Sequence, residues 1–552
     1  MPMTCFPRLR WGLLAAVSAA ALVGCDGDSS NPDITLEQHV ELAALPPEAQ
    51  VPFGSAPLTL PARSAVRFLN QATFGATDAE VAKVEKDWRW GWMQAQFAMP
   101  ITETHWGRVK ARQAIWLSQG TVAAPRDIKD APGVLFDYST WESYFTAPDQ
   151  LRKRVGYALS QIMVTSMNGF VGGGRFTALT GAAYLDVLER NAFGNFRQLL
   201  EDVTLSPAMG YYLSMRGSQK EQKNAQGQVL RVPDENYARE VMQLFTIGLN
   251  KLNLDGTVQT DSDGKPLPSY EPKDVAQLAR VFTGWDLDAP SPDPDALRYS
   301  NPMKNIKALH ETGASTVLGQ PIAAGLTGQE SLDKALDILF EHPNVGPFIG
   351  KQLIQRLVTS NPSPEYVARV ASRFNDNGQG VRGDMRAVID AVLRDPEAMT
   401  PMNIVRPAPG WGKLREPVLK LSAFLRAFPH ASDSGDFKVG NTDNPGNALG
   451  QSPMRSPSVF NFYRPGYVPP GSAAAAAGLA EPELQLAHET SVAGYVNFMR
   501  DAASAGVGNW GTAKNRRDLQ ANYSAELALV EQPVATLPTA LVDHINQKLM
   551  SG

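Results

Sequence analysis

The stretch PDENYAREVMQLFTIGL, residues 233–249, decides the fold of this chain. Asp234 is of a type that caps helices, and Gly248 stands where a left-handed residue would end one. At about 3.6 residues per turn, the apolar side chains fall on one arc and the charged and amide side chains on the opposite arc. We therefore expect a helix that packs into the core through its apolar arc. This arc comprises Tyr237, Val241, Leu244 and Phe245.

The opposite, polar arc of this helix is the first candidate for a functional site. Glu235 precedes Arg239 by four residues, and Asn236 precedes Glu240 by the same interval, so each pair can interact across one helical turn. Close carboxylates can separate their pKa values so that one serves as acid and the other as base, and a nearby histidine could shuttle a proton. The same groups could instead hold a divalent metal, and a solvated face without function is the simplest alternative. The candidate catalytic residues are Asp234, Glu235, Arg239, Glu240 and His310.

Several blocks of this sequence resemble a bacterial family called domain of unknown function 1800. The family signature is close to ENYARE, a hydrophobic residue and then M-x-L-x-T-x-G, which matches residues 235–248. Further matching blocks occur in the order of the family, which makes the resemblance specific. They are RFLNQATFG (67–75), RKRVGYALSQIMVTS (152–166), NAFGNFRQLLEDVTLSPAMGYYLS (191–214), ARVFTGW (279–285) and QSPMRSPSVFNFYRPGYVPPG (451–471).

The resemblance implies a fold and a location, and it assigns no reaction, metal or other cofactor. Many family members carry histidine where this chain has Phe245, so a metal site of that type would lack one ligand here. Many also read His-Asp where this chain has His310 and Glu311. Members are often encoded beside proteins of the domain of unknown function 1501 family, which look like exported relatives of sulfatases and alkaline phosphatases. The resemblance therefore implies a partner of that kind.

The composition fits an ordinary folded protein and argues against one class of partner. The chain has 552 residues, of which 43% are hydrophobic and 19% are charged, so it can bury a large core. Lys and Arg number 51 against 56 Asp and Glu, which gives a net charge of -5. A nucleic-acid binder normally shows a basic surplus, and we therefore expect no nucleic-acid partner.

The N-terminus has the pattern of a bacterial lipoprotein signal peptide over residues 1–24. Arg8 and Arg10 precede an apolar run over 11–23, which is too short for a stable membrane span. The run ends in Leu-Val-Gly-Cys, like a lipobox, so we expect cleavage after residue 24 and lipidation of Cys25. The lipid would anchor the protein to the inner or the outer membrane of the bacterial cell envelope. Because Cys5 lies in the signal, the mature chain would have no free thiol, which excludes disulfides and cysteine-ligated metals.

The rest of the chain divides into three predicted parts. Residues 25–61 are acidic and lack periodicity, which is typical of a disordered tether. Residues 62–505 are predicted to form a mainly α, multi-helix globular body, followed by a C-terminal extension over 506–552. Two Asp-Gly turns within 250–270 predict one or two small β-hairpins. Amphipathic patterns predict helices over 140–166, 329–340, 347–359, 363–374 and 384–394.

Residues 451–471 form the second most informative stretch. Five prolines forbid a long helix, while aromatic side chains supply apolar area, so we expect an extended segment that lies against the body. Arg455 and Arg464 could then reach carboxylates on the polar arc of the 233–249 helix. The segment is either a structural clamp or part of a ligand site. The candidate ligand-binding residues are Asn236, Trp285, Arg464 and His488.

Two functions are compatible with these patterns. The first is an exported, lipid-anchored envelope protein that binds a partner or an extracellular ligand, and that acts with the phosphatase-like or sulfatase-like protein implied by the resemblance. The second is a hydrolase-type or metal-dependent enzyme whose site combines the 234–240 carboxylates with His310 or His488. The common hydrolase and dehydrogenase motifs do not occur in a convincing context. The sequence therefore leaves both functions open.

Overall fold

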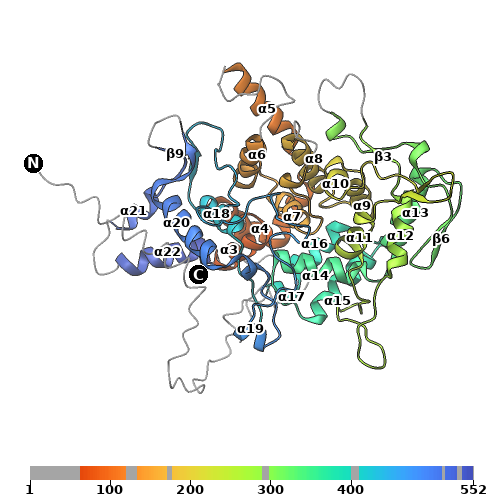
Figure 1. The fold of residues 1–552 in the computed structure, drawn as a ribbon. Coiled ribbons are helices and arrows are strands. Elements are labelled where there is room, and N and C mark those ends of the chain that lie inside the picture. Colours follow the sequence, from red (N-terminus) through yellow and green to blue (C-terminus); the bar gives the residue numbers. More distant parts are fainter. Residues whose placement is uncertain are drawn as a thin grey trace, which may run out of the picture.

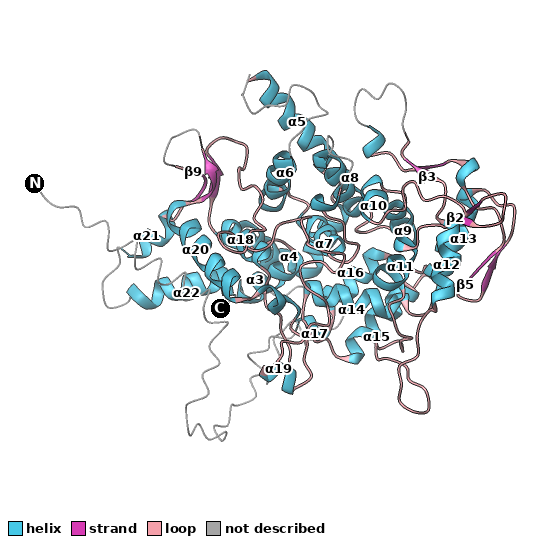
Figure 2. Cartoon of the chain, in the orientation of Figure 1, coloured by secondary structure: helices cyan, strands magenta, loops and turns pink. Residues whose placement is uncertain are grey.

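The computed structural model describes residues 62–119, 133–170, 177–288, 297–399, 410–511, 516–530 and 537–550. The predicted signal peptide, the lipidation residue Cys25 and the tether lie outside these residues. The described chain is mainly α-helical with small antiparallel sheets, which confirms the predicted fold class (Figure 2). None of the described helices combines the length and the apolar character that a membrane span requires.

The first helices pack against a helix from much later in the chain (Figure 1). Helix α3 (Ala62–Ala72) leads through a short turn into α4 (Asp78–Ala98), and α18 (Pro417–Ala427) lies against that turn. Gly75 in the turn has a φ of +139°, and a Cβ there would lie 2.4 Å from the Cα of Ala423. Only glycine therefore allows this approach.

The helix predicted over 140–166 is wrong as a single element. The structure contains α6 (Gly133–Thr146) and α7 (Gln150–Ser160), separated at Pro148. Proline lacks a backbone donor and restricts the residue before it, so the helix ends and restarts there. Every residue of α7 is buried, including its charged side chains.

The central helix is shorter than predicted and changes its winding. It comprises α11 (Asn236–Glu240) and the π-helical turn η3 (Val241–Thr246). The amide of Ile247 donates to the carbonyl of Met242 over 2.9 Å, which is a bond across five residues. At the two ends, Asp234 Oδ1 accepts from the amide of Asn236 over 2.8 Å, and Gly248 has a φ of +70°. The glycine signal is therefore used as predicted, whereas the N-cap residue is Glu235 and Asp234 bonds just in front of the first turn.

The apolar arc of the central helix is inside the main core, as predicted. Tyr237, Val241 and Phe245 are buried, and the Tyr237 ring packs edge-on against Phe282 with centroids 5.0 Å apart. Four helices close to their predicted positions contribute buried side chains to the same core. They are α13 (Gly328–Glu341), α14 (Val345–Leu357), α15 (Pro364–Asn375) and α16 (Met385–Arg394).

The remaining helices complete the body. They are α5 (His105–Ser118), α8 (Thr177–Arg190), α9 (Phe196–Thr204), α10 (Pro207–Tyr212), α12 (Pro272–Val281), α17 (Pro396–Met399), α19 (Ala473–Ala476), α20 (Glu489–Ala505), α21 (Ser524–Val530) and α22 (Leu537–Met550). Short 3₁₀ turns are η2 (Met167–Gly169), η4 (Leu297–Tyr299), η5 (Lys307–Leu309) and η6 (Pro482–Leu486).

The sheets are small, and all strand pairs are antiparallel. The pairs are β1 (Gln222–Lys223) with β2 (Val229–Arg231), β3 (Trp285–Asp286) with β4 (Lys304–Asn305), and β5 (Ser315–Val317) with β6 (Gln320–Ile322). The two predicted Asp-Gly turns also form, with Gly256 and Gly264 at φ of +76° and +78°. Three isolated β-bridges connect the short arms of these turns.

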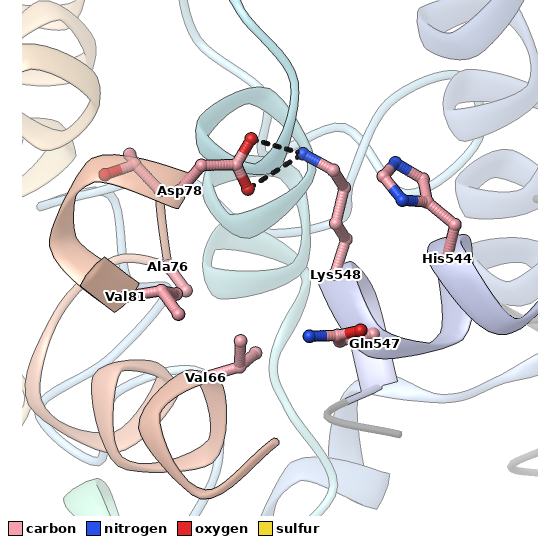
Figure 3. A pocket seen from close by; sticks show the side chains of 8 residues that line it. Val66, Ala76, Asp78, Val81, His544, Gln547 and Lys548 are labelled. Carbon is pink, nitrogen blue, oxygen red and sulfur yellow. Dashed lines mark hydrogen bonds and ion pairs between the residues drawn. The ribbon is translucent and has the colours of Figure 1, made fainter. Parts of the chain in front are cut away.

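The C-terminal residues return to the start of the described chain. β8 (Val507–Trp510) and β9 (Arg517–Ala521) form one sheet with β7 (His430–Ser432), in the order β7-β9-β8. Helix α22 packs against α3 and α18. Figure 3 shows Lys548 donating to both carboxylate oxygens of Asp78, at 3.0 and 2.8 Å, beside a small cavity of about 100 Å³. The region predicted as a C-terminal extension therefore contacts the helical body.

Candidate functional site: a cavity along helix α14

The polar arc of the central helix is mostly solvated. Asp234, Glu235, Asn236 and Arg239 are exposed. Glu235 and Arg239 form the predicted pair over 3.1 Å, but their side chains are 48% and 47% exposed. An exposed ion pair of this kind contributes little to stability or chemistry.

Glu240 differs from its neighbours because it is buried. Its Oε2 has no hydrogen-bond partner among the described residues. Burial raises the pKa of Glu240, and the nearby Arg239 guanidinium opposes that shift only in part. The group is therefore a carboxyl with a raised proton affinity and no fixed partner.

The structure does not assemble the predicted acid, base and histidine into one site. His310 is buried, and its Nδ1 lies 3.1 Å from the carbonyl oxygen of Thr283. No hydrogen bond within the described chain joins His310 to a carboxylate of residues 234–240. Trp285 is buried in the core, and its carbonyl accepts from the amide of Gly217 over 2.8 Å.

His488, the other histidine considered, caps a helix. Its Nδ1 accepts from the amide of Ser491 over 3.4 Å, and the Ser491 hydroxyl accepts from the His488 amide over 2.9 Å. This reciprocal pair is the capping box of α20. The exposed imidazole of His488 therefore has a local structural role.

The proline-rich segment docks elsewhere than predicted. It is extended and irregular, as expected, but Arg455 pairs bidentately with Asp137 of α6, at 3.0 and 2.8 Å. The Arg464 guanidinium lies over the Phe460 ring, 4.9 Å from its centroid. The prediction that both arginines reach the polar arc of the central helix is wrong, because the segment is tied to the α6 and α7 region.

One group among the described residues has the arrangement of a metal site, and the sequence analysis missed it. The ligand atoms of His105, Asp186 and Glu189 lie within 4.8 Å of one another. Glu189 binds His105 Nε2 over 2.8 Å and Lys153 Nζ over 2.5 Å. Asp186 accepts the amides of His105 and Trp106 over 2.6 and 2.9 Å. Because all four carboxylate oxygens already have donors, we interpret the group as a structural ionic network.

The pKa values of the two acids follow from this arrangement. Burial alone would raise the pKa of Glu189, but the charges and hydrogen bonds of His105 and Lys153 outweigh it and hold the value at about 2. For Asp186, burial dominates and raises the pKa to about 6, against the attraction of His105. The network thus fixes the ionised form of Glu189 inside the protein.

A large cavity connects the two sequence stretches that were singled out as informative. It has a volume of about 880 Å³ and lies between helix α14, the η3 turn, the 248–258 region and the 459–468 part of the proline-rich segment. Gln243 and Leu244 of the central helix and the predicted ligand-binding residue Arg464 line it. We call it the α14 cavity.

Helix α14 supplies one complete stripe of the lining. The stripe residues recur at intervals of three and four, which places them on one face of the helix. Three of its polar side chains are buried, with Gln352 8%, Gln355 5% and Arg356 2% exposed. The stripe consists of Phe348, Lys351, Gln352, Gln355 and Arg356. The spacing of this polar stripe can be read from the sequence, because its residues lie opposite an apolar face of the same helix. The amphipathic pattern over 347–359 predicts only a helix that packs, without a site.

The comparisons with known proteins give a family and no activity. A family model described as a protein of unknown function (DUF1800) matches residues 67–552. No curated protein matches the chain, and no solved structure does so either.

Proposed function

This chain belongs to the DUF1800 family, and we propose that it is a ligand-binding protein whose binding site is the α14 cavity. The family description names no activity, so one observation carries the proposal. That observation is a cavity of about 880 Å³ whose described lining residues include cations and amides and no carboxylate.

The size and lining of the cavity are those of a small-molecule site. Ligand pockets commonly measure roughly 300–1,000 Å³ and combine an apolar wall with a few polar groups. Here the wall is mostly apolar, and the polar groups come from α14, from the end of α7 and from the proline-rich segment. Gln161, after α7, is oriented by its bond to Glu416 over 2.7 Å, and it presents an amide oxygen without a partner among the described residues. A preorganised polar group of this kind supports selective binding.

Gly466 allows the cavity to be filled without disturbing the backbone. It lines the cavity, its φ is not positive, and a Cβ there would meet no atom within 4 Å. A Gly466→Trp variant should therefore fold and place its indole in the cavity. We expect the neutral fluorescent reporter N-phenyl-1-naphthylamine to bind the native protein and to lose most of its fluorescence with this variant.

The control variant places a tryptophan ring outside the cavity. Val381 is 43% exposed and does not line the cavity, so Val381→Trp should bind the reporter like the native protein. Equal reporter binding by Gly466→Trp and Val381→Trp would contradict the proposed site.

We further propose that the protein is an exported lipoprotein of the bacterial cell envelope. The support is the lipobox-like sequence ending at Cys25 and the preceding apolar run. Full-length protein should partition with membranes and carry an acylated N-terminal cysteine in mass spectrometry, whereas Cys25→Ser should be released into the soluble fraction. Retention of residues 1–24 in the purified native protein would exclude this location.

The proposed partner is an exported protein of the domain of unknown function 1501 family. Only the resemblance to the family supports this partner. We propose no nucleic-acid partner, because the net charge of -5 gives no basic surplus. Affinity capture of the native lipoprotein from membranes should recover that partner as a major species. Its absence from captures that retain the lipoprotein would remove this proposal.

A further inference from the structure

The inner side of the α14 cavity contains hydrogen-bond donors that the protein leaves unused. Gln355 is fully engaged, since its Nε2 donates to the carbonyls of Ser360 and Pro465 over 3.0 and 3.1 Å. By contrast, Gln352 Nε2 and Arg356 Nε have no partner among the described residues, although both side chains are more than nine-tenths buried. Buried donors are normally satisfied, so an occupant with acceptor oxygens is expected at this position.

The positive charge around these donors is only partly compensated. Arg356 Nη2 donates to the carbonyl of Gln161 over 3.1 Å, and Arg154 donates to the carbonyl of Arg356. Neither guanidinium forms a salt bridge with a carboxylate in the described chain. Glu416 attracts Arg154 and offsets part of its charge, while its Oε2 accepts a hydrogen bond from Gln161. Water could satisfy the free donors, but it would not supply the counter-charge that Arg356 lacks within the described chain.

The mouth of the cavity has the opposite character. Four apolar residues that line it remain substantially exposed, and such grouped exposure on a folded protein is typical of a binding surface. These residues are Leu249 (57% exposed), Val258 (43%), Phe460 (37%) and Val468 (37%). An occupant would thus meet donors and positive charge inside and apolar side chains at the opening.

We propose that the α14 cavity binds an amphipathic anion, with its carboxylate or a comparable oxyanion group on Arg356 and Gln352 and its hydrocarbon part against the apolar mouth. The proposal rests on the proposed function, because it names the ligand class of the same site. Among the described residues, the lining contains no Asp or Glu and therefore no carboxylate that would repel such a head group. An Arg donor and an amide donor together can hold both oxygens of one carboxylate.

Displacement of the bound reporter tests the ligand class. Octanoate carries both features, 1-octanol has the same hydrocarbon chain without the charge, and acetate has the charge without the chain. With native protein, we expect octanoate to displace the reporter at a concentration roughly tenfold below that of 1-octanol, the effect of one charge-assisted hydrogen bond. Acetate should not displace it.

Variants of Arg356 and Gln352 test whether these two donors produce the preference for octanoate over 1-octanol. Arg356→Gln should remove most of the advantage of octanoate over 1-octanol, whatever its effect on the binding of 1-octanol itself. Gln352→Leu should reduce that advantage by a smaller factor, and it keeps the test decisive if Arg356→Gln does not fold. Arg373→Gln, in α15 and outside the cavity, is the matched control and should retain the full preference.

The possible results separate this proposal from the proposed function. If the reporter binds and Gly466→Trp abolishes its binding, but octanoate and 1-octanol compete equally, then the cavity is a binding site and the anion proposal is overturned. The anion proposal also falls if Arg356→Gln and Gln352→Leu both keep the native preference. If Gly466→Trp binds the reporter normally, the proposed site itself fails.

Discussion

Glu189 and Glu240 are both buried carboxylates, and their surroundings shift their pKa values in opposite directions. Burial disfavours the charge of each. Glu189 has two cationic or hydrogen-bonding partners that outweigh this cost and hold its pKa at about 2. For Glu240, burial outweighs the attraction of the exposed Arg239, and the pKa is raised. The same substitution at the two positions should therefore have opposite effects.

Glu189→Gln should strongly destabilise the protein at neutral pH. It leaves the buried Lys153 without its counter-charge, and breaking such a pair costs about 3–5 kcal/mol. Thermal unfolding should show a clear fall in Tm. Glu341→Gln is the control, because that side chain is 69% exposed and its ion pair with Arg382 spans 3.9 Å, so its Tm should stay near the native value.

The pH dependence of this difference has a definite sign. The folded pKa of Glu189 lies at about 2, below its ordinary value of 4.5. Its contribution to stability is therefore complete above pH 4.5 and is lost as the pH falls toward 2. The Tm gap between native protein and Glu189→Gln should narrow within that window, and a gap that stays constant would contradict the ionic network.

Glu240→Gln should instead leave the Tm unchanged or raise it slightly at neutral pH. The raised pKa means that the folded state disfavours the carboxylate, so removing the charge should increase the free energy of unfolding slightly. The benefit should disappear as the pH falls and the native carboxyl becomes protonated. A fall in Tm as large as that of Glu189→Gln would show that Glu240 has a native partner.

The sequence predicted local residue pairs and missed distant ones. The Glu235–Arg239 pair follows from a spacing of four residues, which any helix brings together. Arg455 and Asp137 are separated by 318 positions, and no local rule indicates that they meet. The polar stripe of α14 was readable from spacing alone, but its burial depended on the tertiary contacts of the proline-rich segment.

Among the secondary-structure elements, the η3 turn has the most direct link to the α14 cavity. Its π-helical winding carries Gln243 and Leu244, which line the cavity, between the buried Val241 and Thr246. The Thr246 hydroxyl donates to the carbonyl of Val241 over 2.6 Å, which adds a side-chain hydrogen bond across the turn. Single π-turns of this kind are frequent at functional sites.

Thr246→Val should weaken this turn. The replacement keeps the shape of the side chain but removes a buried donor, which costs about 1–3 kcal/mol. We expect a lower Tm and weaker reporter binding in the α14 cavity. Thr146→Val is the control, since Thr146 makes a similar bond to Glu142 over 2.8 Å at the surface and should change neither quantity.

Helices with clear capping residues were predictable from the sequence. Helices that break or change their winding inside a continuous apolar pattern were not. Helix α13 begins at a capping box in which Thr327 and Glu330 exchange bonds, and its predicted start differs by one residue. Pro148 offered a comparable signal for the break between α6 and α7, but the continuous apolar pattern over 140–166 concealed it. No sequence feature distinguishes the π-turn at 241–246 from an ordinary helical turn.

For the whole molecule, the C-terminal region belongs to a second, smaller core. This core lies where α18, α20 and the three-stranded sheet meet (Figure 1). Phe424 and Leu449 contribute to it together with Val507 and Leu519 from the C-terminal region. The family match also continues to residue 552. The match and the packing therefore both indicate that the C-terminal region and the helical body form one unit.

Ile545→Ala tests whether α22 unfolds together with the body. Ile545 is 3% exposed, and truncating a buried isoleucine costs about 2–5 kcal/mol. If α22 is part of one cooperative unit, the Tm of the whole protein should fall, without a separate low-temperature transition. Val542→Ala is the control, because Val542 is 53% exposed. A new, separate transition would identify an independently unfolding tail.

The contact between Lys548 and Asp78 spans 470 positions of the chain. Helix α3 and the start of α4 therefore cannot obtain their full native neighbours until the ribosome has made residue 548. Native assembly of this end is delayed until then, and the emerging chain has to be protected from aggregation during that interval.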